Sequence, residues 1–373
     1  MPKVLIVGAG FFGATCARLL TDAGWSCQVV DRRPHIGGNA YSRFDEPSQS
    51  HEHVYGAHIF HTNSAKVWDF VQQFATFSPY RHKVVALHGD RMLSLPVNLM
   101  TLHQILGVRT PEEAIAQLAR ERSTAAPGKD LESWCIANVG EAVYRLLIEG
   151  YTAKQWGKPL RELPSSLIRR LPVRLNYNND YFDDRYQGIP IDGYTSLFEN
   201  MLSGVPIELE VDFLDQRDRW MAGFDQIIYS GPLDAYFGHD LGKLEYRSLR
   251  FERSHIATND FQGNSVVNYT ARDVSWTRII EHRHFRAACD PLPETGSTLI
   301  TREFPVTPDE SAEPYYPMDF GSNVELAKRY RARAEALAPR VFFGGRLGDY
   351  RYYDMHQVIG SAMALCAKLL HPE

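Results

Sequence analysis

The hydrophobic positions at the start of the chain follow the pattern of a buried strand, a helix and a second strand. Residues 3–7 read KVLIV, a nearly continuous aliphatic run of the kind found in strands that are covered on both faces. A helix-like pattern follows over residues 14–23, and a second apolar run over residues 27–30 ends at Asp31. This order predicts a βαβ unit.

The periodicity becomes helical between about residues 111 and 151. The segment PEEAIAQLARER follows Thr110, a suitable N-cap, and places Pro111 at the first helical position. We therefore predict a helical insert in the middle of the chain. The next stretch, residues 157–184, is rich in arginine, proline, asparagine and tyrosine, and we interpret it as a long functional loop that acts as a lid.

The second half of the chain alternates in a different way. Short alternating runs over residues 203–229 and 246–305 predict antiparallel strands. The end of the chain repeats the strand–turn–helix pattern of its start, with a strand over residues 341–343, a glycine-rich turn, and a helix over residues 355–370. The first domain is therefore expected to be discontinuous and to be built from both ends of the chain.

Composition and charge narrow the class of protein. The 373 residues are 44% apolar, which is ordinary for a globular protein, and 40 basic against 45 acidic residues leave a net charge of −5. No long basic run predicts a nucleic-acid or membrane partner. No segment approaches the roughly 18 apolar residues of a membrane span, and the first apolar run is too short for a signal peptide. Five scattered cysteines without a CxxC pair predict reduced thiols in a cytoplasmic protein.

The first candidate chemistry is the glycine motif GAGFFG, residues 8–13, between the predicted strand and helix. Gly8 permits a tight turn, Gly10 lets the backbone approach a pyrophosphate, and Gly13 allows close helix packing. The helix N-terminus favours an anion. Asp31 follows Gly13 by 18 positions, at the end of the second strand, where a carboxylate can bind a ribose. These features together predict dinucleotide binding.

Two further glycine clusters favour FAD over NAD as the dinucleotide. Gly37 and Gly38 follow the ribose-binding acid closely, a pattern associated with FAD proteins of the glutathione-reductase type. The segment GGRLGDYRYYDMHQVIG, residues 344–360, supplies a second glycine-rich turn into a helix. Such a turn would aim N–H groups and a positive dipole end at the pyrimidine edge of a flavin, which favours negative charge on the reduced ring.

Aromatic and arginine residues in the middle of the chain suit a nucleotide. The segment GYTAKQWG places Tyr151 and Trp156 beside the arginine-rich loop, where rings can face a base and arginines a diphosphate. By composition alone these rings are at least as well explained as core residues. Spacing alone leaves the same two readings open for Asn268, Arg278, Tyr315, Tyr316 and Tyr352.

Ordered blocks along the whole chain resemble the UDP-galactopyranose mutase family of the bacterial type. The blocks are GAGFFGA, HIGGNAYS, HVYGAHIFHT, SLPVNL, GYTAKQWG, ELPSSLIRRLPVR, DRYQGIPIDGYTSL, YSGPLDAYF, EYRSLRFE, FQGNSVVNYT, TRIIEHRHF, EPYYPM and GGRLGDYRYYDMHQVI. They are long and keep their order, so the resemblance does not depend on one short signature.

The resemblance implies an α/β fold with three parts. A discontinuous Rossmann-like FAD-binding domain of the glutathione-reductase type would comprise residues 1–75, 190–240 and 320–373. An inserted helical domain would span residues 98–170, with a mobile loop at about 157–180. An antiparallel β-sheet domain that contributes to the substrate site would comprise residues 76–97, 181–189 and 241–319.

The resemblance also implies an activity, that of an isomerase of the intramolecular transferase class. Family members use reduced FAD to interconvert UDP-galactopyranose and UDP-galactofuranose without net redox change, through a flavin N5–sugar adduct. The product would supply furanose sugar for cell-surface or secreted glycans. NAD(P)H would be the external reductant, and the two UDP sugars would be the substrates. No nucleic-acid or membrane partner is expected, and the expected assembly is a homodimer.

Site residues follow from the resemblance position by position. The positions matching catalytic residues are Arg170, Arg278 and His58, while flavin N5 is the nucleophile. The positions matching substrate-binding residues are Tyr151, Thr152, Trp156, Arg170, Tyr181, Arg247, Asn268, Arg278, Tyr316 and Tyr352. The positions matching FAD-binding residues are Gly8, Gly10, Phe12, Gly13, Asp31, Gly38, Asn39, His58, Ile59, Asp212, Phe213, Arg346, Tyr353, Asp354, Met355 and His356.

The stretch HEHVYGAHIFH, residues 51–61, contains four histidines whose spacing matches no zinc or HExxH motif, so no metal site is predicted. The resemblance places His58 beside the flavin ring. We interpret His51, His53 and His61 as structural, with His61 just before an expected helix start.

Two positions depart from the family pattern, and other activities stay open. His82 stands where an asparagine is expected near the substrate, and Asp192 replaces a glycine before GYT. An oxidase or dehydrogenase of amines or sugars would use the same fold, although the arginine-rich loop argues against a neutral amine. A binding protein without flavin, like the GDP-dissociation inhibitors of small GTPases, is disfavoured by the intact glycine motifs. The sugar stays open between galactose, N-acetylgalactosamine and related pyranoses.

Overall fold

A parallel sheet forms the nucleus of the fold and confirms the predicted βαβ unit. The computed structural model describes residues 2–122, 130–167, 173–307 and 313–371. Five strands lie in the order β10-β2-β1-β11-β17, and all neighbours are parallel. Their bounds are β1 Lys3–Val7, β2 Ser26–Val30, β10 Ile207–Glu208, β11 Gln226–Tyr229 and β17 Val341–Phe343. The glycine motif lies between β1 and the first helix, α1 Phe11–Asp22.

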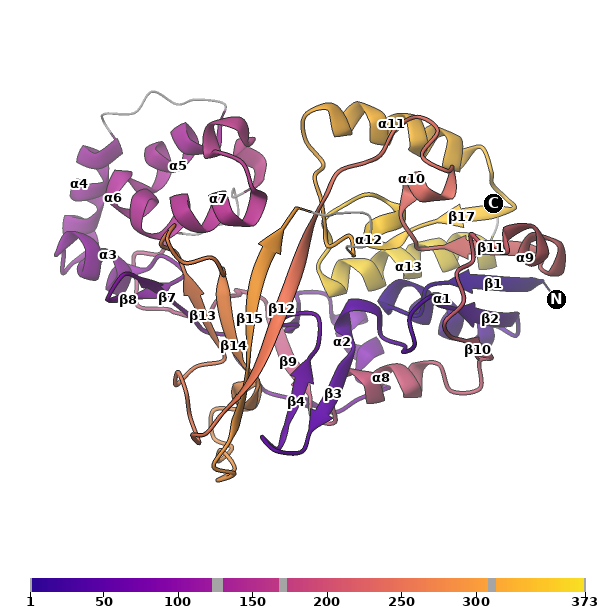
Figure 1. Cartoon of the computed structure of the whole chain (residues 1–373), viewed down its shortest axis with the longest axis horizontal. Coiled ribbons are helices and arrows are strands. Elements are labelled where there is room, and N and C mark those ends of the chain that lie inside the picture. The colour runs from indigo at the N-terminus through magenta and orange to yellow at the C-terminus, as the bar shows by residue number, and fades with distance from the viewer. Residues whose placement is uncertain (1, 123–129, 168–172, 308–312, 372–373) are drawn as a thin grey trace.

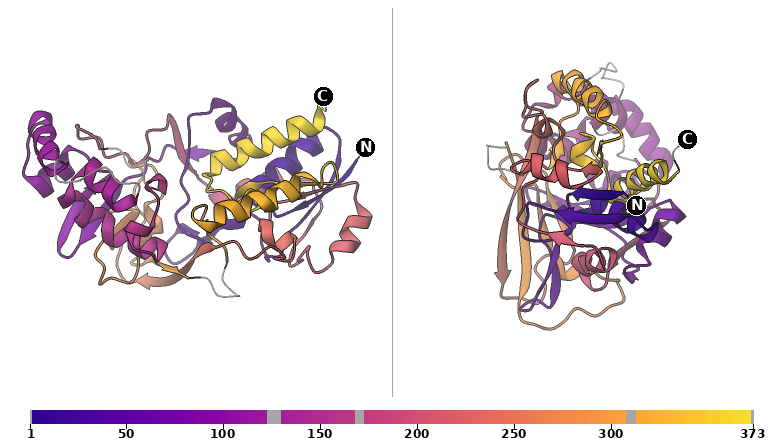
Figure 2. Two further views of the ribbon diagram at one scale, coloured as in Figure 1. Left: turned by 90° about the horizontal axis from the view of Figure 1, so that it is seen from above. Right: turned by 90° about the vertical axis from the view of Figure 1, so that its right-hand side faces the viewer.

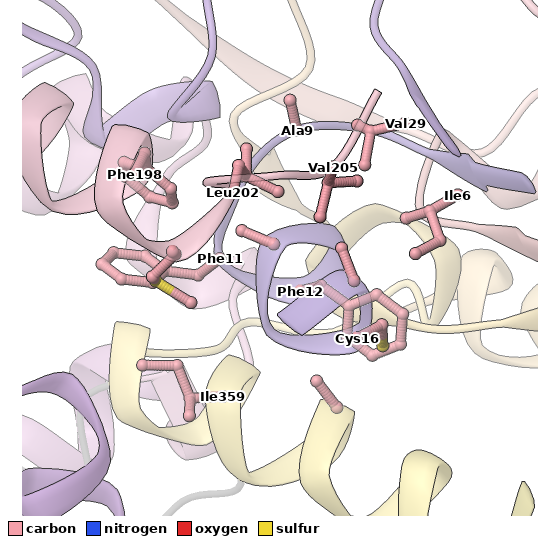
Figure 3. Close-up of a cluster of buried hydrophobic side chains, with 14 of the residues drawn as sticks. Ile6, Ala9, Phe11, Phe12, Cys16, Val29, Phe198, Leu202, Val205 and Ile359 are labelled. Atoms are coloured by element: carbon pink, nitrogen blue, oxygen red, sulfur yellow. The ribbon is translucent and has the colours of Figure 1, made fainter. Parts of the chain in front are cut away.

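Helices cover both faces of this sheet, which is why its central strand β1 is apolar from Val4 to Val7. Val4 and Ile6 belong to a core shared with α1, α8 Gly193–Met201 and α13 Met355–Leu370. Figure 3 shows this core around Phe11, Phe12 and Cys16 of α1, with Phe198 of α8 and Ile359 of α13 beside them.

The opposite face of the sheet carries a second core. Leu5 packs there with Trp220 and Tyr236, which come from α9 Arg217–Gly223 and α10 Leu233–Tyr236. Strand β1 therefore sends alternate side chains into two different cores, and α11 Ser322–Glu335 packs against α10 and β17 on this second side. The chain beyond residue 320 completes a sheet that begins at residue 3, as expected for a discontinuous domain.

The antiparallel strands predicted for residues 203–229 are wrong. This segment instead supplies β10 and β11 to the parallel sheet, with α9 between them. Strand β10 is an edge strand and is only partly buried. Because an edge strand can expose alternate residues in a parallel sheet as well, the alternation of VPIELEV does not reveal the direction of pairing.

A seven-stranded sheet forms the middle of the molecule, and most of the strands predicted for residues 246–305 belong to it. The order is β16-β12-β15-β14-β13-β7-β8. The bounds are β7 Val84–His88, β8 Arg91–Leu95, β12 Tyr246–Ile256, β13 Val266–Tyr269, β14 Arg278–Glu281, β15 Thr298–Val306 and β16 Tyr316–Pro317. The sheet is not purely antiparallel, because β13 and β7 pair in parallel.

The predicted helical insert is present at the far end of this sheet. It contains α3 Leu99–Leu106, α4 Pro111–Arg122, α5 Leu131–Val139, α6 Glu141–Val143, a π-helical turn η2 Tyr144–Glu149, and α7 Gly150–Trp156. Thr110 accepts a hydrogen bond from the backbone of Glu113 at the start of α4, as expected of an N-cap. In Figures 1 and 2 this insert and the parallel sheet lie at opposite ends, with the seven-stranded sheet between them.

Small elements bridge the two sheets. The hairpin β3 Ser42–Asp45 and β4 Ser50–His53 lies beside α8, and β5 Phe60–Thr62 and β6 Phe77–Ser78 both pair with β9 Tyr186–Pro190. Helix α2 Ala65–Val71 begins behind Ser64, which caps it. Short helical turns complete the fold: η1 Gly38–Ala40, η3 Leu160–Glu162, η4 Ser165–Leu167, η5 His282–His284 and α12 Gly345–Gly348. Within the described part of the chain, no helix has both the length and the apolar character to cross a membrane.

Candidate active site

One elongated cavity connects the parallel sheet to the seven-stranded sheet. Its volume is about 640 Å³, within the range of sites that hold small molecules and cofactors. One end is lined by residues that follow β1, β2 and β11, at the carboxyl edge where open α/β sheets bind ligands. The other end is lined by side chains of β13, β14 and β15. A single ligand chamber therefore spans both parts of the fold.

The glycine turn gives the first end of the cavity a bare backbone surface. A Cβ atom on Gly13 would lie 1.9 Å from the carbonyl oxygen of Gly8, so the start of α1 packs directly on the turn. The backbones of Gly10 and Gly38 lie close together in the cavity wall, since a Cβ on Gly10 would lie 3.6 Å from the Gly38 Cα. Two glycines in this position leave room for a ligand to approach the backbone.

Asp31 closes this end at the carboxyl end of β2. Its carboxylate accepts hydrogen bonds from the backbone N–H of Ala9 at 2.7 Å and of Arg33 at 2.9 Å. The N–H of Val211 donates to the Asp31 carbonyl at 3.0 Å, which brings Asp212 and Phe213 to the same part of the cavity. Residues that lie 180 positions apart in sequence thus form one binding surface.

The loop that carries His58 is held by side chains behind it. The backbone N–H of His58 donates to Nδ1 of His53 at 3.1 Å, and the hydroxyl of Tyr194 donates to the His58 carbonyl at 3.1 Å. The His58 ring itself lies 2.8 Å from the Gly56 carbonyl through Nδ1. Burial, and to a lesser extent the Arg346 charge, lower the pKa of His58 to about 4, so a neutral imidazole faces the cavity.

The histidines of residues 51–61 therefore make different contacts and do not form one cluster. His53 is fully buried, stacks on Phe285, and positions His58. His61 belongs to β5, and the helix expected just after it is α2, which begins at Ala65 behind its cap Ser64. The Nδ1 of His61 lies 2.7 Å from the Asp184 carboxylate.

Within the described part of the chain, only His61 of these four histidines approaches other groups that could hold a metal ion. It converges with Asp354 and His356, whose ligand atoms lie within 4.8 Å of one another. A second such group, Asp260, Glu281 and His284, lies in the sheet domain. The expectation that the protein holds no metal stays untested.

Arg278 dominates the other end of the cavity. Its guanidinium donates to the hydroxyl of Tyr151 at 2.8 Å, and its Nε lies 3.2 Å from the carboxylate of Glu303. Burial opposes the charge of Arg278, but Glu303 and nearby tyrosines outweigh burial and hold its pKa well above the usual value. Burial raises the pKa of Tyr151 to about 12, so its phenol stays protonated. The result is a permanent cation that faces the cavity beside a neutral hydroxyl.

Neighbouring side chains offer further polar contacts. Asn268 pairs with Arg278 in the β13–β14 register, and its buried Oδ1 has no hydrogen-bond partner among the described residues. Tyr316 and Tyr352 stack with centroids 5.8 Å apart, and Tyr352 is still 51% exposed. An unpaired acceptor and an open ring at a cavity wall are the features expected where a ligand completes the contacts.

Most of the sequence-predicted site residues line this one cavity. They are Gly8, Gly10, Phe12, Asp31, Gly38, Asn39, His58, Ile59, Asp212, Phe213, Arg346, Tyr353, Asp354 and Met355 at one end, and Tyr151, Tyr181, Asn268, Arg278, Tyr316 and Tyr352 at the other. Five predicted residues do not line it: Gly13, Thr152, Trp156, Arg247 and His356. Arg170 lies outside the described residues.

Arg247 and Trp156 face neighbouring protein groups. Arg247 is 5% exposed and donates to the backbone carbonyl of Gln155 at 3.0 Å and to the hydroxyl of Thr307 at 2.9 Å. Trp156 packs edge-on against Phe320. These contacts hold the end of α7 against the seven-stranded sheet.

Sequence reasoning missed several lining residues. Glu303 is 2% exposed and pairs with Arg278, and its pKa is raised by burial although Arg278 acts in the opposite direction. The only signal in the sequence is a carboxylate in the apolar run TLITREFPV, which does not say which strand lies opposite. Arg33 and Glu313 form an ion pair of 3.1 Å at the first end of the cavity. His82, which the sequence placed near the substrate only as a departure from the family pattern, also lines the cavity, beside the rings of Tyr181 and Phe182.

Three buried neutral histidines should make the fold sensitive to mild acid. Burial lowers the pKa of His82 to about 3 and of His282 to about 4, and lowers that of His53 well below its usual value. Below about pH 6.5 the unfolded chain binds protons on these rings while the folded chain does not, so stability falls as the pH falls. Each ring contributes a loss of about 1 kcal/mol between about pH 7 and pH 5.5.

Denaturant unfolding at these two pH values measures the effect. We expect the free energy of unfolding to fall by about 3 kcal/mol or more, because His58, whose pKa is lowered to about 4, adds a fourth ring while His284 works in the opposite direction. Although burial disfavours its charge, Glu281 and Asp260 raise the pKa of His284. A His282→Gln variant should lose stability at both pH values but show a pH dependence smaller by about one proton. A wild-type free energy that is the same at both pH values would contradict the assignment.

Comparison with known proteins identifies relatives over the full chain. A family model described as UDP-galactopyranose mutase matches residues 146–352, and one described as NAD(P)-binding Rossmann-like domain matches residues 6–74. A dTDP-fucopyranose mutase of Escherichia coli is 38% identical over 99% of this chain and 98% of its own length. A probable UDP-galactopyranose mutase of Klebsiella pneumoniae is 37% identical over 99% and 94%.

Solved structures share the fold. The crystal structure of reduced UDP-galactopyranose mutase matches with a TM-score of 0.73 at 15% identity, covering 100% of this chain and 97% of that one. A putative protoporphyrinogen oxidase from Exiguobacterium sp. 255-15 matches with a TM-score of 0.63 at 12% identity, over 99% and 98%. At these sequence identities the structural matches establish a shared fold and nothing about activity.

Proposed function

We propose, given that the chain belongs to the UDP-galactopyranose mutase family, that it interconverts the pyranose and furanose forms of a nucleotide-linked sugar on bound, reduced FAD. The reaction is an isomerisation without net redox change. The observation that carries the proposal is the single cavity that joins a dinucleotide cradle to the Arg278 end, so that a flavin and a nucleotide sugar can meet inside it.

The residues present fit FAD. Gly10 and Gly38 leave the bare backbone that a diphosphate needs, and Asp31 lies where the adenosine ribose would be bound. Arg346 lines the cavity, and among the described residues no carboxylate pairs with it, so an anionic ligand would supply its counter-charge. Reduced FAD, when bound, supplies an electron-rich ring nitrogen as the nucleophile.

The protein's own groups then have defined tasks. Arg278 would meet the nucleoside diphosphate as it separates from the sugar, because a permanent cation stabilises the charge that develops there. Tyr151 would orient Arg278 through their hydrogen bond, and Asn268 would use its free Oδ1 to accept a hydrogen bond from the substrate. His58 would remain a neutral hydrogen-bonding group beside the flavin, since its pKa is lowered to about 4.

A second candidate substrate has direct support from the relatives. UDP-galactopyranose and dTDP-fucopyranose differ in both base and sugar, and mutases named for each are almost equally similar to this chain, at 37% and 38% identity. We therefore propose UDP-galactopyranose as the first substrate to test and dTDP-fucopyranose as the second.

An assay of ring interconversion tests the proposal. Purified protein, reduced with dithionite, is incubated with UDP-galactofuranose, its N-acetyl analogue or dTDP-fucofuranose, and the products are resolved by chromatography. We expect one furanose to be converted to its pyranose form by the reduced protein, and the activity to disappear when the flavin is reoxidised. If the reduced, flavin-loaded protein converts none of the three, the proposal is wrong.

The proposal extends to the setting of the enzyme. We propose NAD(P)H as the physiological reductant, a homodimer as the assembly and the cytoplasm as the location, where the five free cysteines would stay reduced. The lid expected over residues 157–180 stays a prediction, because residues 168–172, Arg170 among them, lie outside the described part of the chain.

A further inference from the structure

The ammonium group of Lys154 is enclosed by four backbone carbonyls. Its Nζ lies 2.8 Å from the carbonyl oxygen of Tyr269 and 2.9 Å from those of Ala271, Val274 and Trp276. An ammonium has three N–H donors, so more acceptors converge on this cation than it has protons. Rings of backbone carbonyls replace the water shell of monovalent cations elsewhere in proteins. We call these four oxygens the carbonyl cage.

The carbonyl cage attaches a turn to a helix. The turn at residues 270–276 connects β13 to β14, whereas Lys154 belongs to α7. Helix and turn touch closely, because a Cβ on Gly150 would lie 2.2 Å from the carbonyl oxygen of Thr270. Outside the cage, Arg272 and Glu149 form an exposed ion pair of 2.8 Å, a kind that contributes little. Lys154 is therefore the main polar attachment between the turn and the helix.

The β13–β14 hairpin and α7 also carry the two active-site groups that contact each other, the guanidinium of Arg278 and the hydroxyl of Tyr151. Asn268 and Arg278 are register partners on either side of the turn. Tyr151 precedes Lys154 by one helical turn on α7, and its hydroxyl accepts the hydrogen bond from Arg278. Helix and hairpin are thus joined at two points, through Lys154 at the turn and through Tyr151 in the cavity.

Other contacts hold α7 in place without Lys154. Arg247 donates to the carbonyl of Gln155 from the side of β12 and β15, and Trp156 packs on Phe320. Thr270 also donates to the carbonyl of Leu146 at 2.7 Å, before α7 begins. Loss of the ammonium should therefore leave the helix folded and free the turn, together with the strand end that carries Arg278.

We propose that Lys154 is a positioning residue for the nucleotide site: by binding the carbonyl cage it fixes the β13–β14 turn to α7 and so sets the contact between Arg278 and Tyr151. This inference rests on the proposed function for the identity of the ligand, a nucleoside diphosphate. Lys154 acts through Arg278, since it does not itself line the cavity.

A Lys154→Met variant removes the charge and keeps the length of the side chain. The measurement is the dissociation constant of UDP and of dTDP for the FAD-loaded protein, by calorimetry. We expect affinity for the preferred nucleotide to fall by about tenfold or more, with normal FAD content, because the cation would no longer be held in register. The matched control is Lys328→Met, a change at a 62% exposed lysine of α11 that pairs with Glu325.

Coupling to Tyr151 separates positioning from general destabilisation. Tyr151→Phe should weaken nucleotide binding in the wild-type background and have a much smaller effect in the Lys154→Met background, because both changes release the same arginine. If the double variant instead loses affinity by the product of the two single fold-losses, Lys154 does not act through the Arg278–Tyr151 pair and the inference is wrong.

Chemical rescue provides a second, independent variant. Lys154→Ala leaves the carbonyl cage without its cation, and added ammonium or ethylammonium should restore nucleotide binding, whereas tetramethylammonium, which has no N–H group, should not. Should Lys154→Met fail to fold with FAD, this rescue and the Lys154→Arg variant decide the matter. The planar fork of arginine cannot match four converging carbonyls, so Lys154→Arg is expected to bind nucleotide weakly as well.

The outcomes distinguish the inference from the proposed function. If the wild type binds nucleotide and Lys154→Met binds it as tightly as Lys328→Met does, the inference about Lys154 is overturned and the proposed function stands. Rescue of Lys154→Ala by tetramethylammonium as well would also overturn it. A wild-type protein that binds neither UDP nor dTDP would overturn both.

Discussion

Replacing Arg278 with lysine is expected to lower kcat/KM for the nucleotide sugar by about a hundredfold or more. The arginine contacts the hydroxyl of Tyr151 and the carboxylate of Glu303 at the same time, with donors left to face the cavity. A lysine carries one compact charge and cannot serve three directions. Each charged hydrogen bond that is lost costs about 1.5 to 3 kcal/mol, and about 1.4 kcal/mol corresponds to a tenfold change in rate.

Steady-state kinetics of the reduced protein measure this effect. The control is Arg250→Lys, a change on β12 of the same sheet at a side chain that is 52% exposed and does not line the cavity. Arg278→Lys should keep its FAD, because Arg278 lies at the opposite end of the chamber from the glycine turn. If Arg278→Lys were as active as Arg250→Lys, the assignment of Arg278 to the diphosphate would have to be abandoned.

Replacing Gly10 with alanine is expected to abolish FAD binding while leaving the protein folded. The backbone of Gly10 has φ −83° and ψ −172°, which alanine adopts without strain. The new Cβ would lie 3.6 Å from the Gly38 Cα, an ordinary contact for the protein alone. A bound diphosphate, however, must approach the backbone at this residue, so the methyl group would occupy its place. We expect FAD affinity to fall by about a hundredfold or more.

Absorbance of the purified protein and thermal unfolding of the FAD-free form distinguish ligand loss from misfolding. Gly360→Ala on α13 is the matched control, since nothing lies within 4 Å of its added Cβ. Gly13→Ala should behave differently from both, because a Cβ there would meet the Gly8 carbonyl at 1.9 Å and disturb the fold itself. If the Gly10→Ala protein purifies yellow with a full complement of flavin, the assignment of the Gly10 and Gly38 backbone to the FAD diphosphate is wrong.

Much of the fold could be predicted because its signals are local. The run KVLIV, the glycine turn and the N-cap at Thr110 each depend on neighbours within a few residues, and the elements they predict are present. The strands of residues 203–229 were mispredicted because pairing direction is a property of distant partners. The parallel pairing of β13 with β7 inside a mostly antiparallel sheet escaped for the same reason.

The residues of the candidate site also differ in whether local sequence or distant contacts reveal them. Glycines and Asp31 could be identified from spacing, since a turn between strand and helix is one continuous segment. Glu303 could not, because its role follows from standing opposite Arg278 in the register of β14 and β15. Lys154 reads in the sequence as a surface lysine of a short helix, and only the folded turn brings four carbonyls to its ammonium.

The packing of α1 against α13 determines when, during synthesis and folding, the protein can bind its cofactor. These helices share one core although more than 300 positions separate them, and β17 joins β11 just before α13 begins. During synthesis the glycine turn leaves the ribosome more than 300 residues before its covering helix, and well before the last strand of its sheet. The helical insert can fold earlier, since its contacts are local. The cofactor must therefore be captured after translation has passed α13, so that nascent chains interrupted before that point carry no flavin.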